Sequence, residues 1–208
     1  KMQIDLSSKE SSEIYHLLTQ TIVPRPIAWI LTENKAGAGE PFNLAPFSFF
    51  NAMASAPPTL VVSIGKKPTG EEKDTRVNLA EGELCVVHIP QVTHMQAVSD
   101  SSKTLEYGDS ELKHSQMDHC DFEGFALPRL ADCPIAFGCK VAKVVEWGPA
   151  PQALILLQIS HAFIDDEICT QDDKGRTRVD AKKLNPLARL GANEYAELGD
   201  ILTLARPD

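Results

Sequence analysis

Three lysines lie close to the expected start of a short helix in the segment KKPTGEEKDTRVN. They are Lys66, Lys67 and Lys73, and either Asp74 or Thr75 can cap the helix that follows. The first turn of a helix exposes unpaired backbone N–H groups and the positive end of its dipole, so it favours an anion. The lysines add charge and Thr75 adds a hydroxyl donor, which predicts a site for a phosphate monoester. A capped helix on a solvated loop is the alternative that needs no ligand.

The stretch NLAPFSFFNAMASAPP, residues 43–58, is apolar but carries small polar side chains and three prolines. A strand that serves only for packing is richer in Val and Ile. Pro46 removes a backbone donor and predicts an edge or bulged strand, whose neighbouring backbone groups can face a ligand. Asn43 and Ser48 add hydrogen-bonding side chains beside aromatic residues. This combination suits a flat heterocycle, and an irregular strand with internally satisfied polar groups fits the residues equally well.

The segment ARLGANEY, near the C-terminal end, offers a cation and an aromatic ring. Arg189 and Tyr195 are six residues apart across Gly191, so one loop can present both side chains to the same site. A surface turn explains the same residues, and the segment alone leaves both interpretations open.

The histidines and cysteines that could ligate a metal are His114, His119, Cys120 and Cys133. His119 and Cys120 are adjacent, so their side chains project differently, and no pair has the spacing of a structural zinc site. We therefore expect no metal. The chain also lacks the G-x-S-x-G pattern of a serine nucleophile. Because Cys85 lies in an apolar, strand-like run, we assign no catalytic side chain.

The composition limits the class of protein. With 208 residues, of which 43% are hydrophobic and 24% charged, the sequence predicts one globular domain over residues 1–208. Its net charge of −9 argues against nucleic acid as a partner. The five cysteines contain no C-x-x-C pair, which indicates a reducing compartment. No apolar run approaches the roughly 18 residues of a membrane span, so we expect a cytoplasmic protein without membrane contact.

Six β-prone runs alternate with loops and a few short helices. The runs are PIAWIL (26–31), a run from Phe42 onward, TLVVSI (59–64), ELCVVHI (83–89), IAFGCKVAKVVEW (135–147) and ALILLQISHAFI (153–164). The last two flank a GPAPQ turn and predict a long hairpin. Helices are expected before Pro24, after Lys73 and in part of the segment 92–116. Together these elements predict a mainly β protein, an antiparallel barrel whose strands each bury one face.

Several segments, in this order, resemble the flavin reductase-like family of FMN-binding split barrels, which includes the small flavin reductase components of two-component monooxygenases. They are VPRPIAWILT (23–32), NLAPFSFFNAMASAPPTLVVSIG (43–65), KDTRVNL (73–79) with GELCVVHI (82–89), and ARLGANEY (188–195). They cover most of the chain, and residues 92–130 are not diagnostic. The resemblance implies a six-stranded antiparallel Greek-key split barrel with a few peripheral helices. It also implies a homodimer with one FMN per subunit near the interface.

The resemblance implies which residues surround the cofactor. The isoalloxazine ring would be lined by Asn43, Leu44, Ala45, Pro46, Ser48, Phe49 and Phe50. The ribityl chain and phosphate would be contacted by Ser63, Gly65 and Lys66, and the phosphate site completed by Lys73, Asp74 and Thr75. A nicotinamide could stack on the open side of the flavin, beside Arg189 and Tyr195. Arg25 would serve either the phosphate or the dimer contact.

The function implied by the resemblance is that of an FMN-binding oxidoreductase that reduces flavin with NAD(P)H, with FMN favoured over FAD. Hydride transfer then belongs to the cofactor, and the protein supplies position and electrostatics. A monooxygenase could receive the reduced flavin. Two alternatives remain: an FMN-dependent oxidase on the same barrel, and a non-enzymatic FMN-binding electron carrier.

Overall fold

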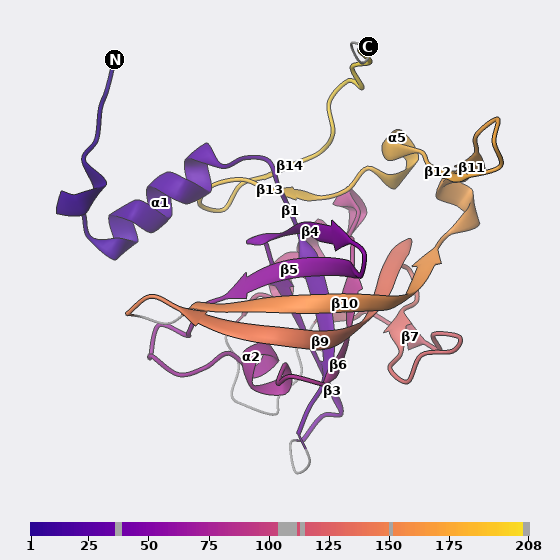
Figure 1. Cartoon of the computed structure of the whole chain (residues 1–208), viewed down its shortest axis with the longest axis horizontal. Coiled ribbons are helices and arrows are strands. Elements are labelled where there is room, and N and C mark those ends of the chain that lie inside the picture. Colours follow the sequence, from indigo (N-terminus) through magenta and orange to yellow (C-terminus); the bar gives the residue numbers. More distant parts are fainter. Residues whose placement is uncertain (36–38, 104–111, 113–114, 150–151, 206–208) are drawn as a thin grey trace.

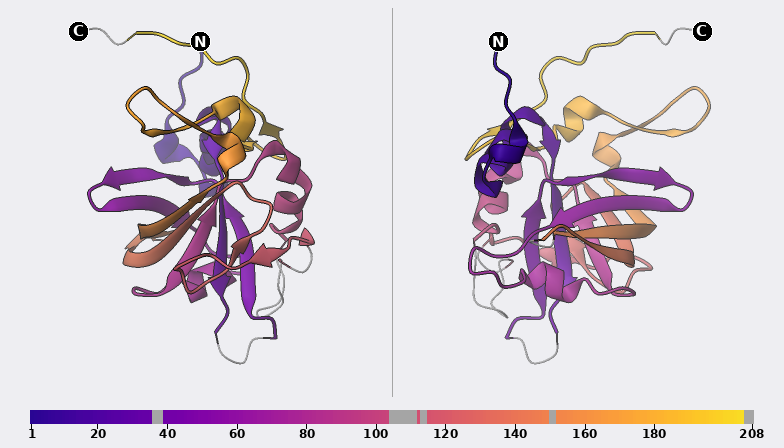
Figure 2. Two further views of the ribbon diagram at one scale, coloured as in Figure 1. Left: turned by 90° about the vertical axis from the view of Figure 1, so that its right-hand side faces the viewer. Right: turned by 60° about the vertical axis from the view of Figure 1, so that its left-hand side comes forward.

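A computed structural model describes residues 1–35, 39–103, 112, 115–149 and 152–205 of the chain. Its main feature is a seven-stranded antiparallel sheet with the strand order β3-β2-β6-β9-β10-β5-β4 (Figure 1). The strands are β2 (Ala28–Glu33), β3 (Phe42–Phe47), β4 (Phe50–Ser55), β5 (Pro58–Ile64), β6 (Leu84–His88), β9 (Ile135–Trp147) and β10 (Gln152–Ile164). Figure 2 shows that the sheet curls on itself, with the β4–β5 hairpin projecting from it. The expected mainly β class and the long β9–β10 hairpin are confirmed.

The remaining elements are short and lie around the sheet. The helices are η1 (Leu6–Ser8), α1 (Ser11–Thr21), α2 (Asp74–Asn78), η2 (Val92–His94), α3 (Met95–Asp100), η3 (Asp166–Ile168) and α5 (Ala181–Leu184). The short strands are β1 (Arg25–Pro26), β7 (His119–Cys120), β8 (Arg129–Leu130), β11 (Cys169–Gln171), β12 (Thr177–Val179), β13 (Ala188–Arg189) and β14 (Tyr195–Ala196). Within the described ranges, no helix is long and apolar enough to cross a membrane.

The stretch 43–58 forms two strands, so the expectation of six strands is wrong by one. β3 pairs with β2 and β4 pairs with β5, and these two strands are the opposite edges of the sheet. The edge position expected from Pro46 is therefore confirmed for β3. The chain bends through Ser48 and Phe49, and the Ser63 backbone N–H donates to the Phe49 carbonyl at 2.8 Å. The bend contains no Gly, Asn or Pro, and Ser48 is its one residue of a type that favours turns, so the local turn signal is weak.

One hydrophobic cluster fills the interior of the curled sheet. Alternate residues of the strands supply it, as for Ala28 and Ile30 on β2 and Cys85 and Val87 on β6. Cys85 and Cys139 are buried cross-strand neighbours with free thiols, and the hydrogen bond between the two thiols, together with burial, raises the pKa of Cys85. Cys85 is thus a core residue, as its apolar strand suggested.

A second cluster covers the outer face of β2 and β6. It joins Trp29 and Leu31 of β2 and Val86 of β6 to residues that follow β6, such as Val98 and Leu130. β2 is consequently buried on both faces along almost its whole length, and the expectation of one buried face per strand is wrong for this part of the sheet. The covering layer also fixes α3, because the Trp29 indole N–H donates to Ser101 Oγ at 2.8 Å.

His88 is the titratable group most tightly enclosed by this outer layer. Its side chain is fully buried, and the Leu130 backbone N–H donates to Nε2 at 2.9 Å. Nε2 is therefore an acceptor, which leaves the ring proton on Nδ1 to donate to the Trp29 carbonyl at 3.0 Å. Burial disfavours the charged imidazolium and lowers the pKa of His88 to about 4.

We predict that the free energy of unfolding falls as the pH is lowered from about 6.5 to about 4, because the unfolded chain takes up the His88 proton in this window and the folded chain does not. A shift of this size corresponds to about 3 kcal/mol. Urea unfolding at several pH values measures it, and His88→Gln should flatten the pH dependence whatever its effect on stability at pH 7. Equal slopes of unfolding free energy against pH in the wild type and in His88→Gln contradict the assignment. His94→Gln is the comparison variant: burial also lowers the pKa of the less enclosed His94, so this variant shows how much of the pH dependence belongs to His94 instead.

Candidate functional site

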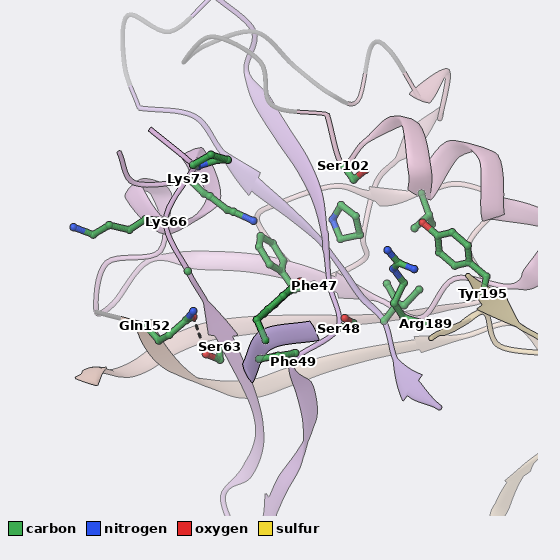
Figure 3. Close-up of a pocket in the computed structure, with 16 residues that line it drawn as sticks. Phe47, Ser48, Phe49, Ser63, Lys66, Lys73, Ser102, Gln152, Arg189 and Tyr195 are labelled. Atoms are coloured by element: carbon green, nitrogen blue, oxygen red, sulfur yellow. Dashed lines mark hydrogen bonds between the residues drawn. The ribbon is translucent and has the colours of Figure 1, made fainter. Parts of the chain in front are cut away.

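A cleft of about 550 Å³ opens beside the β3–β4 bend (Figure 3). Segments far apart in the sequence meet there: α1, the bend, the end of β5, the loop before α2, α3 and the β13–β14 turn. The residues predicted for the site that line it are Pro46, Ser48, Phe49, Ser63, Gly65, Lys66, Lys73, Arg189 and Tyr195. The fold therefore brings together both ends of the predicted site.

A recess of about 100 Å³ adjoins the cleft and shares Lys73 and Phe47 with it. Four further predicted residues line this recess: Asn43, Ala45, Asp74 and Thr75. Leu44 and Phe50 line neither space. The Leu44 side chain is buried in the outer hydrophobic cluster, and Phe50 packs against the interior cluster, because neighbouring strand residues point to opposite faces.

Six residues that line the cleft were not singled out in the sequence: Tyr15, Ile27, Pro68, Val98, Ser102 and Gln152. Gln152 arrives through the pairing of β10 with β5, and Val98 and Ser102 arrive through the packing of the layer that covers β2. No local pattern marks any of them. Phe47 lies inside the predicted stretch and stands between the two ends of the cleft in Figure 3.

Lys73 supplies a positive charge at one end of the cleft, beside Lys66. It is the N-cap of α2, and no side chain of the described residues caps that helix, so the expectation that Asp74 or Thr75 does so is wrong. The Lys73 ammonium lies 5.7 Å from the centre of the Phe47 ring. Within the described ranges it has no ion-pair partner, and burial lowers its pKa. A buried cation without a carboxylate favours an anionic ligand.

Asp74 and Thr75 have other partners. The Asp74 carboxylate lies 2.8 Å from Lys67 Nζ, with both side chains largely buried. Thr75 Oγ1 accepts a hydrogen bond from Asn43 Nδ2 at 3.0 Å, which leaves its hydroxyl hydrogen to donate. Asn43 Oδ1 is buried and has no hydrogen-bond partner among the described residues. The recess therefore holds a hydroxyl donor and an unsatisfied amide acceptor beside Lys73.

In the wall at the end of β5, Ser63 and Gly65 lie against the side chain of Gln152. Ser63 Oγ donates to Gln152 Oε1 at 3.3 Å. A Cβ at Gly65 would lie 2.8 Å from Gln152 Nε2, closer than real Cβ atoms come to their neighbours. A larger residue at position 65 would therefore displace the Gln152 amide from this wall.

Arg189 and Tyr195 form the other end of the cleft, opposite Lys66 and Lys73 in Figure 3. The guanidinium of Arg189 lies 4.7 Å from the centre of the Tyr195 ring. It donates to the Glu194 carbonyl at 2.7 Å and to the Ala192 carbonyl, so its own loop fixes it.

Arg25 is the cross-strand partner of Arg189 and is 6% exposed. It donates to the carbonyls of Thr19, Ile22 and Leu190 and, at 3.3 Å, to Ser48 Oγ. Neither role expected for Arg25 describes these contacts: the side chain ties the end of α1 and the C-terminal segment to the β3–β4 bend.

The arrangement can hold a flat ring against aromatic and proline side chains, with a phosphate at the lysine end. Among the described residues, no group of three or more His, Cys, Asp or Glu could hold a metal ion. Of the metal ligands weighed from the sequence, His114 lies outside the described residues.

Comparison with known proteins identifies the fold and family. Residues 20–172 match the family model of flavin reductase-like domains. An uncharacterized protein of Halalkalibacterium halodurans is 35% identical, over 99% of this chain and 97% of its own. Among solved structures, nitrilotriacetate monooxygenase component B from Bacillus cereus has a TM-score of 0.87 and 28% identity, over 98% of both chains.

Two further structures agree. The 2-nitrobenzoate 2-nitroreductase of Pseudomonas fluorescens has a TM-score of 0.85 and 27% identity, over 99% of this chain and 96% of its own. A split-barrel chain from Shewanella frigidimarina, 15% identical over 100% of both chains with a TM-score of 0.81, shows the same fold. The chain therefore belongs to the family of flavin reductase-like domains.

Proposed function

We propose that this protein is an FMN-dependent oxidoreductase that reduces flavin with NAD(P)H. The family supports a flavin-binding oxidoreductase. The observation that carries the finer proposal is the cleft itself. Lys73, which has no ion-pair partner among the described residues, and Arg189 stand at opposite ends of its apolar, aromatic floor. Because the cleft draws residues from α1 to β14, we also propose that residues 1–208 form one domain.

The residues present fit FMN. The ammonium of Lys73 and the hydroxyl of Thr75 suit its phosphate, and the buried Asn43 Oδ1 suits a hydroxyl of the ribityl chain. Pro46, Phe47 and Phe49 offer apolar surface to the ring. The recess, of about 100 Å³, supports a terminal phosphate and hence FMN over FAD. When bound, the flavin supplies the hydride-accepting chemistry, and we assign no catalytic side chain.

The nicotinamide end of the proposal depends on Arg189 and Tyr195. An aromatic ring can pack against a nicotinamide and a cation can bind the phosphates of a dinucleotide, and the β13–β14 turn holds both Tyr195 and Arg189 in place. NAD(P)H would thus enter from the arginine end, and flavin would lie with its phosphate toward the lysine end.

We predict that Lys73→Met weakens FMN binding at least tenfold and changes riboflavin binding little. The substitution removes a charge-assisted contact to phosphate, worth about 1.5–3 kcal/mol, that riboflavin does not make. Quenching of flavin fluorescence measures both affinities. Lys35→Met is the matched control, because Lys35 pairs with Glu83 on the exposed surface. Equal losses for FMN and riboflavin would place the phosphate elsewhere.

We predict FMN-dependent oxidation of NADH or NADPH, with a turnover number of at least about 1 per second. Loss of reduced-nicotinamide absorbance, measured with and without FMN, checks it. Flavin binding without turnover by either nucleotide would favour the electron carrier. Oxidation of another reduced substrate by bound FMN would favour the oxidase. The structure from Bacillus cereus is named as a monooxygenase component, and on that ground we propose an oxygenase as consumer of the reduced flavin.

An apolar groove of about 530 Å³ supports the proposed homodimer. It runs between α1 and the tip of the β9–β10 hairpin and is lined largely by Ile14, Tyr15, Leu18, Phe49, Val145, Trp147 and Leu154. The Trp147 side chain is 76% exposed in the single chain. Tyr15 and Phe49 also line the cleft. A second copy that covers the groove would therefore border the flavin site and remove large apolar side chains from water.

We predict that Trp147→Glu weakens dimer formation by about 2–4 kcal/mol, the range of an interface hot spot, because it puts a carboxylate into the apolar contact. Sedimentation velocity over a range of protein concentrations measures the association. Met95→Glu is the control, since Met95 is exposed but lies outside the groove. A wild-type chain that sediments as a monomer at all concentrations contradicts the proposal.

A further inference from the structure

Two arginines face each other where β1 pairs with β13. Arg25 and Arg189 are cross-strand partners in this short antiparallel ladder. Side chains directly opposite on adjacent strands share one face, and like charges in this position repel each other. Within the described part of the chain, neither arginine has a carboxylate within ion-pair distance. The pair is therefore a local concentration of positive charge in a protein whose net charge is −9.

The charge of Arg25 is buried and has no carboxylate partner among the described residues. All four of its acceptors are neutral: three backbone carbonyls and the hydroxyl of Ser48. Its burial and the nearby charge of Arg189 both lower the pKa of the Arg25 guanidinium, which nevertheless stays protonated in a protein. The fold therefore maintains a second cation next to Arg189 at a cost in stability.

Arg189 presents the same charge to the cleft. Two of its five N–H groups are used by the carbonyls of Ala192 and Glu194, and the Tyr195 ring lies over the guanidinium. The remaining donors are held in a fixed planar fork, which is the geometry that carboxylate and phosphate oxygens accept. Because its own loop already orders the side chain, binding an oxyanion costs little further conformational entropy.

We propose that the arginine end of the cleft is a subsite for an oxyanion, a carboxylate or phosphate, carried by the second ligand, the compound that exchanges electrons with the flavin. Arg189 contacts the oxyanion, and Arg25 is a positioning residue that adds charge and fixes the Ser48 end of the β3–β4 bend. The inference rests on the proposed flavin function. Figure 3 places this subsite opposite Lys73, so the flavin phosphate and the second anion occupy separate ends.

Two matched ligand pairs test the subsite by titration calorimetry on the protein with and without FMN. Benzoate against benzamide reports a carboxylate, and nicotinamide mononucleotide against nicotinamide riboside reports a phosphate. We expect the anion of at least one pair to bind about tenfold more tightly than its neutral analogue at low salt, with the preference falling as salt is added. Equal affinities within both pairs overturn the proposal. If the protein does not bind FMN, only the proposed function is contradicted. The ratio of anion affinity to neutral-analogue affinity is still measured on the protein without flavin, so the subsite is tested separately.

Substitutions of single arginines show which side chain produces the preference for the anion over its neutral analogue. Arg189→Met should abolish the anion-to-neutral ratio while FMN affinity changes less than about twofold, and Arg189→Lys should retain part of it. Arg25→Lys keeps a charge that can still reach the carbonyls of α1 and should lower the ratio less than Arg189→Met does; its thermal unfolding reports the structural role separately. Arg76→Met is the control, because Arg76 pairs with Glu146 outside the cleft. An unchanged ratio in Arg189→Met overturns the proposal.

Discussion

The bend at Ser48 and Phe49 is the constraint on which the rest of the structure depends. One continuous stretch supplies both edges of the sheet, so the sheet must curl for β3 to lead into β4. The Ser63 N–H to Phe49 carbonyl bond fastens the bend to β5, and the Arg25 to Ser48 bond fastens it to α1 and the C-terminal segment. The bend therefore fixes the floor of the cleft and holds β5, α1 and the C-terminal segment beside it. A strand that continued straight would leave no cleft.

The hydrophobic layer outside β2 places α3 beside the cleft. Because Trp29 and Leu31 are buried outward while Ala28 and Ile30 are buried inward, β2 is held between two apolar clusters. The outer cluster contains Val98, which carries α3 to the edge of the cleft. Burial on both faces stabilises β2 more than contact with a barrel interior alone, at roughly 25 cal/mol per Å² of apolar surface. The site is thus supported by the most completely buried strand of the sheet.

Sequence patterns predicted the elements that depend on local residues and missed the contacts that depend on tertiary structure. The apolar runs of β2, β5, β6, β9 and β10 were recognisable from their composition, and Pro46 marked an edge. Asp74 looked like a cap because nothing local shows that Lys67 engages its carboxylate. Gln152 and Ser102 reach the cleft only through strand pairing and layer packing, so no window of sequence could have identified them.

The distribution of charge separates structural cations from those available to a ligand. Lys35, Arg76 and Lys67 each lie within ion-pair distance of a carboxylate in the described structure. Lys73 and Arg189, which line the cleft, have no such carboxylate there, although the protein has more acidic than basic residues. An anion at either end would compensate the cation there, which supports the proposed flavin phosphate beside Lys73 and the proposed second oxyanion beside Arg189.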